Sequence, residues 1–309
     1  MSITVVLQQM IMIFILIGVG MILYKKEMLS EVTSKQISGI IVNVTNPALL
    51  ICSAFREGPK ASLKELGTAL IIYMIVYAIL IAVSFLIPYI LRVPNQYYYC
   101  YQMLTVFGNV GFIGIPLASA VLGTESLIFV SIYNLIFNIL IYTFGISVLQ
   151  RVAKQQESDA SSRWKKLINA GTISAVATII FYLGDFPVPV IISSTLTYMG
   201  QATTLLSMLV LGVSVAQMAL KDIFSHKRLY GFVILRQILV PVCCIMLFRP
   251  FISNTLILNT LALMLAVPAA NTPLMLCKQL NIEGDTISQG IILSTILSLM
   301  TIPIICLLL

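Results

Sequence analysis

Residues 108–116 read Gly-Asn-Val-Gly-Phe-Ile-Gly-Ile-Pro, and residues 268–273 read Pro-Ala-Ala-Asn-Thr-Pro. Both stretches interrupt long apolar runs. Glycine lets the backbone turn freely and proline removes an intrahelical hydrogen bond, so each stretch predicts a break in a helix. Backbone without helical hydrogen bonds is tolerated inside a membrane only where it lines a cavity or is buried in protein. The two stretches therefore predict a functional site at membrane depth.

The composition of the chain indicates an all-α integral membrane protein. Of its 309 residues, 59% are hydrophobic and 9% are charged, and the mean hydropathy is +1.03. Soluble domains carry about 25% charged residues, so most of this surface must face lipid. The apolar runs extend for about 20 residues without alternation, which favours spanning helices over a β-barrel.

The sequence predicts ten transmembrane helices in two halves of five. We expect them at residues 3–24, 37–55, 66–91, 96–122 and 126–149, and at residues 165–183, 193–220, 229–248, 256–280 and 286–308. The polar stretch QRVAKQQESDASSR at residues 150–163 separates the halves. We assign residues 1–150 to a first repeat, 151–164 to a cytoplasmic loop and 165–309 to a second repeat. Each repeat has five helices, an odd number, so the second repeat would cross the membrane in the opposite orientation to the first, as in many secondary transporters.

The two Gly/Pro stretches fall in the fourth helix of each half. Asn109 lies 14 residues before Gly123, and Asn271 lies 13 residues before Gly284. Paired breaks in corresponding helices of two repeats are the best sequence indication of a transporter's binding site. The alternative is a pair of packing kinks, in which small residues let helices approach closely.

The chemistry expected at the breaks suits an anion. Each break would expose the N-terminus of a half-helix, with free N–H groups and a positive dipole end, and Asn109 and Asn271 would add neutral amides.

All eleven acidic residues and His226 fall in expected loops or at helix ends, so no obvious proton relay lies inside the membrane. Sodium stays open as a coupling ion, bound by backbone carbonyls and Asn, Ser or Thr oxygens. No catalytic, metal-binding or cofactor motif is found.

Arg236 is the one charged residue that lies well inside an expected helix, away from its ends. An ionisable residue in the membrane is a candidate functional group, here a counter-charge for an anion. It lies about two turns from the cytoplasmic end of its helix, so the alternative is a snorkelling side chain.

The basic residues predict the orientation. Thirteen basic residues lie in or beside the loops that follow odd-numbered helices, and four lie in the loops that follow even-numbered helices. The positive-inside rule then places both termini outside the cytoplasm, in a multi-pass protein of the cytoplasmic membrane. The net charge of +7 therefore indicates orientation rather than nucleic-acid binding.

Four stretches of this chain resemble the auxin efflux carrier family. GNVGFIGIPLASAVLG at residues 108–123 looks like its fourth-helix signature, and VPAANTPLML at 267–276 resembles its ninth helix. NVTNPALLICSAF at 43–55 and GIILSTILSLMTIPII at 290–305 are similar to its second and last helices. The resemblance implies a compact bacterial-type member within the bile/arsenite/riboflavin transporter superfamily.

The resemblance also implies that the helices form two domains with different roles. Helices 1, 2, 6 and 7 would form a scaffold, and helices 3–5 and 8–10 a transport domain with crossing broken helices. By motif position, the resemblance implies that Asn109 and Asn271 are substrate-facing amides and that Pro116 and Pro268 shape the crossover. Asn46 stands where the family usually has an apolar residue, and it is a further substrate-binding candidate together with Gly111 and Thr272. Gly108, Gly114 and Pro273 are the other residues expected to shape the crossover.

The resemblance implies secondary transport of small organic carboxylate anions, such as malate, malonate or auxin, by alternating access. Because an inside-negative potential drives a monoanion outward, export or exchange is the leading direction. A sodium-coupled symporter, a channel and a ligand-sensing membrane protein are the alternatives. An enzyme is disfavoured, because the sequence has neither HExxH nor GxSxG. The expected partners are substrate and lipid but not nucleic acid, and a homodimer stays open.

Overall fold

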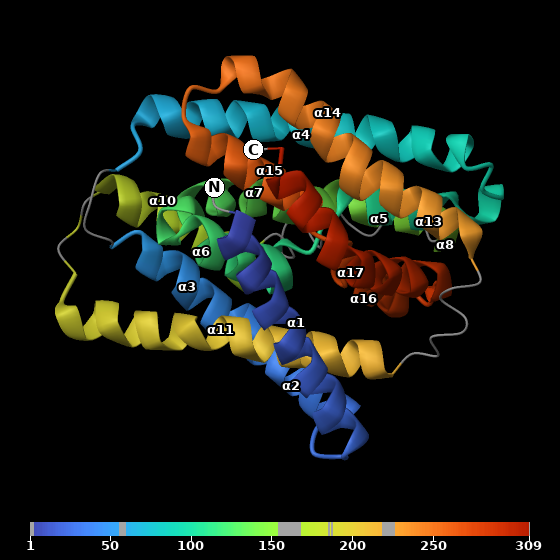
Figure 1. Cartoon of the computed structure of the whole chain (residues 1–309), viewed down its shortest axis with the longest axis horizontal. Coiled ribbons are helices and arrows are strands. Elements are labelled where there is room, and N and C mark those ends of the chain that lie inside the picture. The colour runs from blue at the N-terminus through green and yellow to red at the C-terminus, as the bar shows by residue number, and fades with distance from the viewer. Residues whose placement is uncertain are drawn as a thin grey trace.

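The computed structural model describes residues 3–55, 60–153, 168–184, 186, 188–217 and 226–308, and within these ranges the regular elements are all helices. The expected polar loop at residues 151–164 lies almost wholly outside the described residues. Figure 1 shows the helices lying mostly along the long axis of the molecule, with the two broken segments between them.

The helical segments occur where the hydrophobic runs predicted them. In the first half they are α1 (Ile3–Lys25), α2 (Glu31–Ile40), η1 (Ile41–Thr45), α3 (Asn46–Ser53), α4 (Leu63–Ile90), η2 (Asn95–Tyr97), α5 (Tyr98–Val106), η3 (Val110–Gly114), α6 (Ile115–Leu122), η4 (Thr124–Ser126), α7 (Leu127–Leu140), η5 (Ile141–Gly145) and α8 (Ile146–Ala153). In the second half they are α10 (Ala170–Gly184), α11 (Val190–Ala216), α13 (Lys227–Val233), η6 (Ile234–Leu239), α14 (Val240–Phe248), η7 (Arg249–Phe251), α15 (Thr255–Ala266), α16 (Thr272–Gln279) and α17 (Asp285–Cys306).

Six helical stretches in the described part of the chain are long and apolar enough to cross a membrane. By length and composition alone they are Glu31–Ser53, Leu63–Ile90, Thr124–Ala153, Val190–Ala216, Lys227–Phe251 and Asp285–Cys306. Shorter apolar helices cover Ile11–Lys25, Val110–Leu122, Ala170–Gly184 and Thr255–Ala266. The chain is therefore a multi-pass, all-helical membrane protein.

Several helices widen into a π-turn just before a proline. The π-segments η1, η3 and η6 each lead into a helix whose second residue is proline, namely Pro47, Pro116 and Pro241. Proline has no N–H to donate and its ring clashes with the carbonyl one turn earlier, and a wider preceding turn relieves that clash at these three sites, whereas Pro88 and Pro303 lie within α4 and α17 without one. The Gly/Pro stretch at 108–116 is thus mostly a π-helix, and the true break is shorter than the motif.

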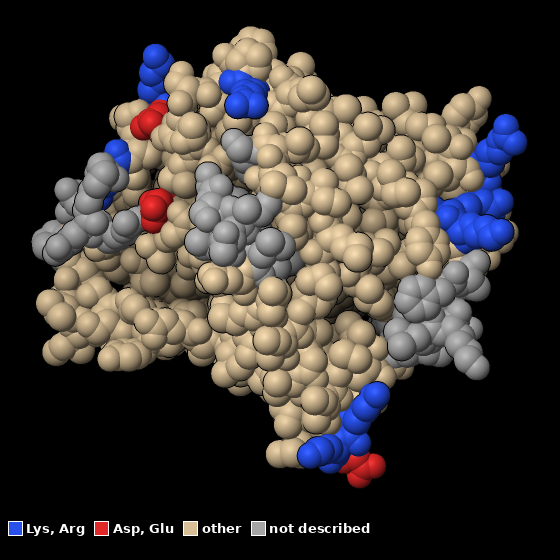
Figure 2. Space-filling model, viewed as in Figure 1, with Lys and Arg blue, Asp and Glu red and all other residues tan. Residues whose placement is uncertain are grey.

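The contacts between helices place α11 beside η3, which follows the first break. It lies along α1 and against α3, η1 and η3, while α4 packs on α5 and α7, and α15 packs on α17. In Figure 1, α4 and α14 lie along one side, α11 along the other, and α5, α6, α7 and α15 between them. Figure 2 shows that the described charged residues on this face gather at the helix ends and loops.

The contact between α1 and α11 depends on two glycines. A Cβ atom on Gly212 would lie 2.2 Å from Ile17 O and 2.8 Å from Gly20 Cα, and a Cβ on Gly20 would lie 2.4 Å from Leu209 O. Small residues of this kind let membrane helices pack backbone to backbone.

Candidate functional site

The two broken helices meet through their breaks. Gly108 and Ala269 form an isolated antiparallel β-bridge. The N–H of Asn109 donates to Pro268 O at 2.7 Å, and the N–H of Ala270 donates to Phe107 O at 2.9 Å. Each break therefore satisfies backbone groups of the other, which is how unwound chain can persist at this depth.

Asn109 begins the second half of the first broken helix. Its Oδ1 accepts from the N–H of Phe112 at 3.1 Å, so its side chain caps η3. The residue is 2% exposed, and its Nδ2 is buried without a hydrogen-bond partner in the described part of the chain. An unpaired buried amide N–H is costly, so Asn109 offers a donor that a bound ligand could satisfy.

Asn46 lies against the same half-helix. Its Nδ2 donates to Gly111 O at 3.1 Å, and a Cβ on Gly111 would lie 3.5 Å from that nitrogen. Its Oδ1 is buried and finds no partner within the described ranges. The structure thus brings Asn46, Asn109 and Gly111 together around the start of η3.

Replacing Asn46 with alanine is expected to loosen this contact. The substitution leaves Gly111 O without its donor, which costs about 1 kcal/mol and lowers the apparent Tm by about 2–4 °C. Asn43→Ala is the matched control, because Asn43 is exposed and donates only to Gly39 O in its own helix. The thermal unfolding of both variants in detergent checks the prediction, and equal losses would contradict it.

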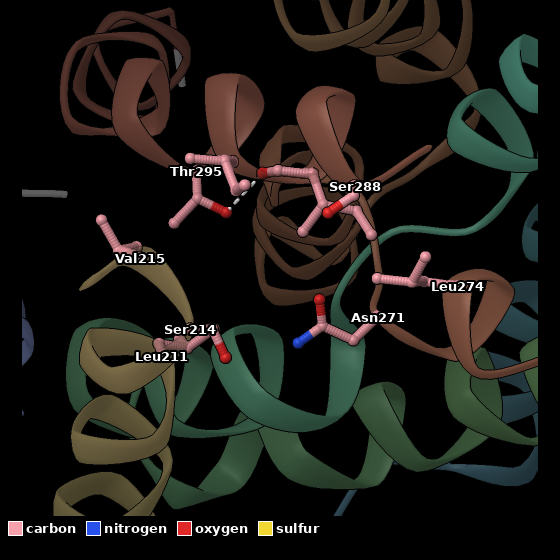
Figure 3. A pocket seen from close by; sticks show the side chains of 9 residues that line it. Leu211, Ser214, Val215, Asn271, Leu274, Ser288 and Thr295 are labelled. Carbon is pink, nitrogen blue, oxygen red and sulfur yellow. Dashed lines mark hydrogen bonds between the residues drawn. The ribbon is translucent and has the colours of Figure 1, made fainter. Parts of the chain in front are cut away.

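Asn271 lies at the other break and lines a small cavity of about 20 Å³. The cavity is enclosed by Leu211, Ser214 and Val215 of α11, by Leu274 of α16, and by Ser288, Ile291, Ile292 and Thr295 of α17. Figure 3 shows the Asn271 amide pointing into the space between Ser214 and Ser288. Such a volume holds about one water molecule. Helix η3 begins directly after Asn109, and α16 begins directly after Asn271. Each asparagine thus stands at the start of the half-helix that follows its break.

The remaining predicted residues divide between the breaks and the half-helices. Gly108 and Pro268 lie in the breaks, whereas Gly114, Pro116, Thr272 and Pro273 lie in the second half-helices. A Cβ on Gly108 would lie 3.0 Å from Val267 Cγ2, and one on Gly114 would lie 3.1 Å from Met264 Sδ, so both sites are tightly packed.

Sequence reasoning missed the polar side chains that α11 and α17 contribute to the cavity. Ser214, Ser288 and Thr295 line the cavity with Asn271. On η1 and α11, which contact each other, the hydroxyls of Thr45, Thr203 and Ser207 are buried without hydrogen-bond partners among the described residues. Single Ser and Thr residues are common in apolar helices, so the sequence does not distinguish these from others. They stand out only because the fold brings them close together.

Arg236 is buried at the crossover. It is 2% exposed, so it does not snorkel toward the helix end. Its Nε donates to Thr105 O, in the last turn of α5, and its Nη1 donates to Leu265 O at 2.6 Å, in the last turn of α15. The sequence predicted a charge inside the membrane here, but the partners are carbonyls of the two broken helices.

A second, larger cleft of about 600 Å³ opens near one end of the same region. Its lining residues are Val93, Pro94, Tyr97, Tyr101, His226, Lys227, Arg228, Glu283, Asp285, Thr286 and Gln289. On α17, Thr286 and Gln289 of the cleft lie within one turn of Ser288 and Ile292 of the small cavity. The cleft therefore approaches the Asn271 cavity along α17.

Comparison with known proteins shows which family the chain belongs to. Residues 5–306 match the family described as Membrane transport protein. An uncharacterized transporter of Methanocaldococcus jannaschii is 23% identical over 304 residues, covering 95% of this chain and 96% of its relative. An uncharacterized transporter of Methanothermobacter thermautotrophicus is 21% identical over 299 residues, covering 94% of each chain. The family match spans nearly the whole chain, and the chain belongs to the Membrane transport protein family, whose members are auxin efflux carrier-like membrane transporters.

Proposed function

We propose that this transporter carries small organic carboxylate anions, of the malate, malonate or auxin kind, across the cytoplasmic membrane by alternating access. The observation that carries the proposal is the pairing of the two helix breaks. Because Gly108 and Ala269 are bridged, the second half-helices both begin at one place, and one of them opens on the small cavity at Asn271, whose mostly aliphatic lining includes one amide and three hydroxyls.

The electrostatics of the crossover favour an anion over a cation or a neutral solute. Helix N-termini carry about half a positive charge each, and η3 and α16 both begin beside the paired breaks. The cavity lining holds hydroxyls and an amide but no charged side chain among the described residues. A carboxylate there would receive N–H and O–H donors, including the N–H groups at the start of α16.

We further propose that the chain forms ten spans as a 5+5 inverted repeat. The segments α5–α6 and α15–α16 would be equivalent, and antiparallel pairing of equivalent breaks is what oppositely oriented repeats would give. The scaffold would comprise α1, α2–α3, α10 and α11, and the other helices would form the transport domain. The Asn271 cavity would then lie between them, with α11 on one side and α16 and α17 on the other.

A cavity of about 20 Å³ is too small for a dicarboxylate, so binding would require α16 and α17 to move away from α11. By the distribution of basic residues, the large cleft would open to the cytoplasm, with both termini outside. Its lining carries Lys227 and Arg228 but also Glu283 and Asp285, so the attraction for an anion would come from the helix N-termini at the crossover rather than from the cleft. This arrangement supports loading from the cytoplasm and hence export or exchange.

The test is a thermal-shift screen of purified protein against malate, malonate, lactate and indole acetate. Cys100, Cys244, Cys277 and Cys306 are buried, so a thiol-reactive dye reports unfolding as a rise above the signal from the exposed Cys243 and the half-buried Cys52. A ligand that binds the folded state at one hundred times its Kd stabilises it by about 2.7 kcal/mol, or about 5–11 °C. We expect one carboxylate class to give this shift in the wild type and little or none in Asn271→Ala.

The matched control for that screen is Asn254→Ala, which removes an amide that caps α15 at the far end of the same broken helix. It should keep the ligand-induced shift although its basal Tm falls. Full shifts in Asn271→Ala, or no shift with any carboxylate in the wild type, would refute the proposed substrate class and site.

A further inference from the structure

The guanidinium of Arg236 joins the carboxyl-terminal ends of both first half-helices. Its hydrogen bonds go to Thr105 O of α5 and Leu265 O of α15. The last four carbonyls of a helix have no intrahelical partner, and a buried helix end needs another donor. One side chain therefore satisfies carbonyls at two helix ends that the crossover brings face to face.

The charges at this point balance without an acidic residue. Each helix C-terminus carries about half a negative charge, so the ends of α5 and α15 together offset about one positive charge. The ionisable side chains that interact with Arg236 are those of Tyr133, Tyr77 and Cys244, which are neutral at pH 7. No carboxylate within the described residues accompanies them, so the two helix ends act as the counter-charge.

The position is one where transporters of this architecture bind a coupling ion. Carbonyls of unwound backbone and half-helix C-terminal ends coordinate Na⁺ or H⁺ in broken-helix transporters. Here a guanidinium, tethered to η6, already makes those contacts. A free sodium ion beside it would meet like charge in a buried environment, and like charges repel strongly there.

We propose that Arg236 is a built-in cation that takes the place of a coupling sodium ion at the crossover. The proposal rests on the proposed function in treating the crossover as the transport site. It assigns Arg236 a positioning role at the two helix ends, which its Nε and Nη1 bond, while its Nη2 is buried without a hydrogen-bond partner among the described residues.

Removing the fixed cation should create a site for a free one. Arg236→Ala leaves the facing helix ends uncompensated and opens a cavity the size of the lost side chain. We expect the apparent Tm in choline chloride to fall by about 6–12 °C. Guanidinium at ten times its Kd should then restore about 3–6 °C, and sodium should restore part of this in place of choline at equal ionic strength.

The controls separate charge from packing. Arg249→Ala removes an exposed arginine at the end of the same helical stretch and should show neither the loss nor the rescue. Arg236→Lys keeps the charge and should retain most of the stability without added cations, whereas Arg236→Met fills the space without charge and should behave like alanine. Wild type should unfold at the same temperature in sodium and choline chloride.

Three results would overturn the inference. They are specific stabilisation of the wild type by sodium, equal cation responses of Arg236→Ala and Arg249→Ala, and a stability of Arg236→Met equal to that of the wild type. Should Arg236→Ala not fold, the wild-type and Arg236→Lys measurements still decide the question. None of these readouts uses a carboxylate, so they can fail while the carboxylate screen succeeds, or the reverse.

Discussion

Gly212→Leu is expected to lower the apparent Tm of the protein by about 6–12 °C, because overpacking costs up to about 3 kcal/mol. The Cβ alone would lie 2.2 Å from Ile17 O and 2.8 Å from Gly20 Cα, and these backbone atoms cannot turn aside as a side chain could. The leucine would force α1 away from α11 along the whole contact. Helix α11 also lines the Asn271 cavity, which is the proposed substrate site. Displacing α11 should therefore abolish transport as well as lower stability.

Gly18→Leu is the matched control for this prediction. Gly18 lies on α1, two residues before Gly20, and a Cβ there would have no atom within 4 Å. We expect its Tm to stay within about 2 °C of the wild type. If Gly18→Leu and Gly212→Leu are equally destabilised in a thiol-dye melt, the α1–α11 contact does not have the importance assigned to it.

Asn109→Ala is expected to reduce anion affinity by about 10–150-fold, the equivalent of one hydrogen bond to a charged group. It removes the buried Nδ2 that has no partner within the described ranges, and also the Oδ1 that caps η3. Loss of the cap should cost a further about 0.5–2 kcal/mol of stability. Ligand titrations followed by thermal shift give both quantities from one sample.

Asn109→Asp separates the two roles of this side chain. A carboxylate keeps the acceptor for the Phe112 N–H and is favoured at a helix N-terminus, so stability should be retained. The same negative charge would repel a carboxylate substrate, so binding should be lost. Retained anion binding in Asn109→Asp would show that the substrate does not approach this end of η3.

The sequence determined the class of the protein and the location of its helices, because both follow from local composition. A chain with 9% charged residues must face lipid, and lipid requires helices of about 20 apolar residues. The two breaks could be found for the same reason, since glycine and proline act on the backbone of their own turn. The exact break could not, because a π-turn absorbs most of the motif at 110–116 and leaves only 107–109 unwound.

Only the tertiary structure decided which groups meet. Arg236 stands 131 residues from Thr105 and 29 from Leu265, and no periodicity links them. Ser214 joins Asn271, and Asn46 joins Gly111, because helices distant in sequence cross there. A helix end leaves carbonyls and N–H groups unsatisfied whatever the sequence around it, and the partner that satisfies them is fixed by packing. The sequence thus determined that the helices break, whereas the fold determined that the breaks pair, that the guanidinium of Arg236 joins the ends of α5 and α15, and that a small cavity forms beside the start of α16.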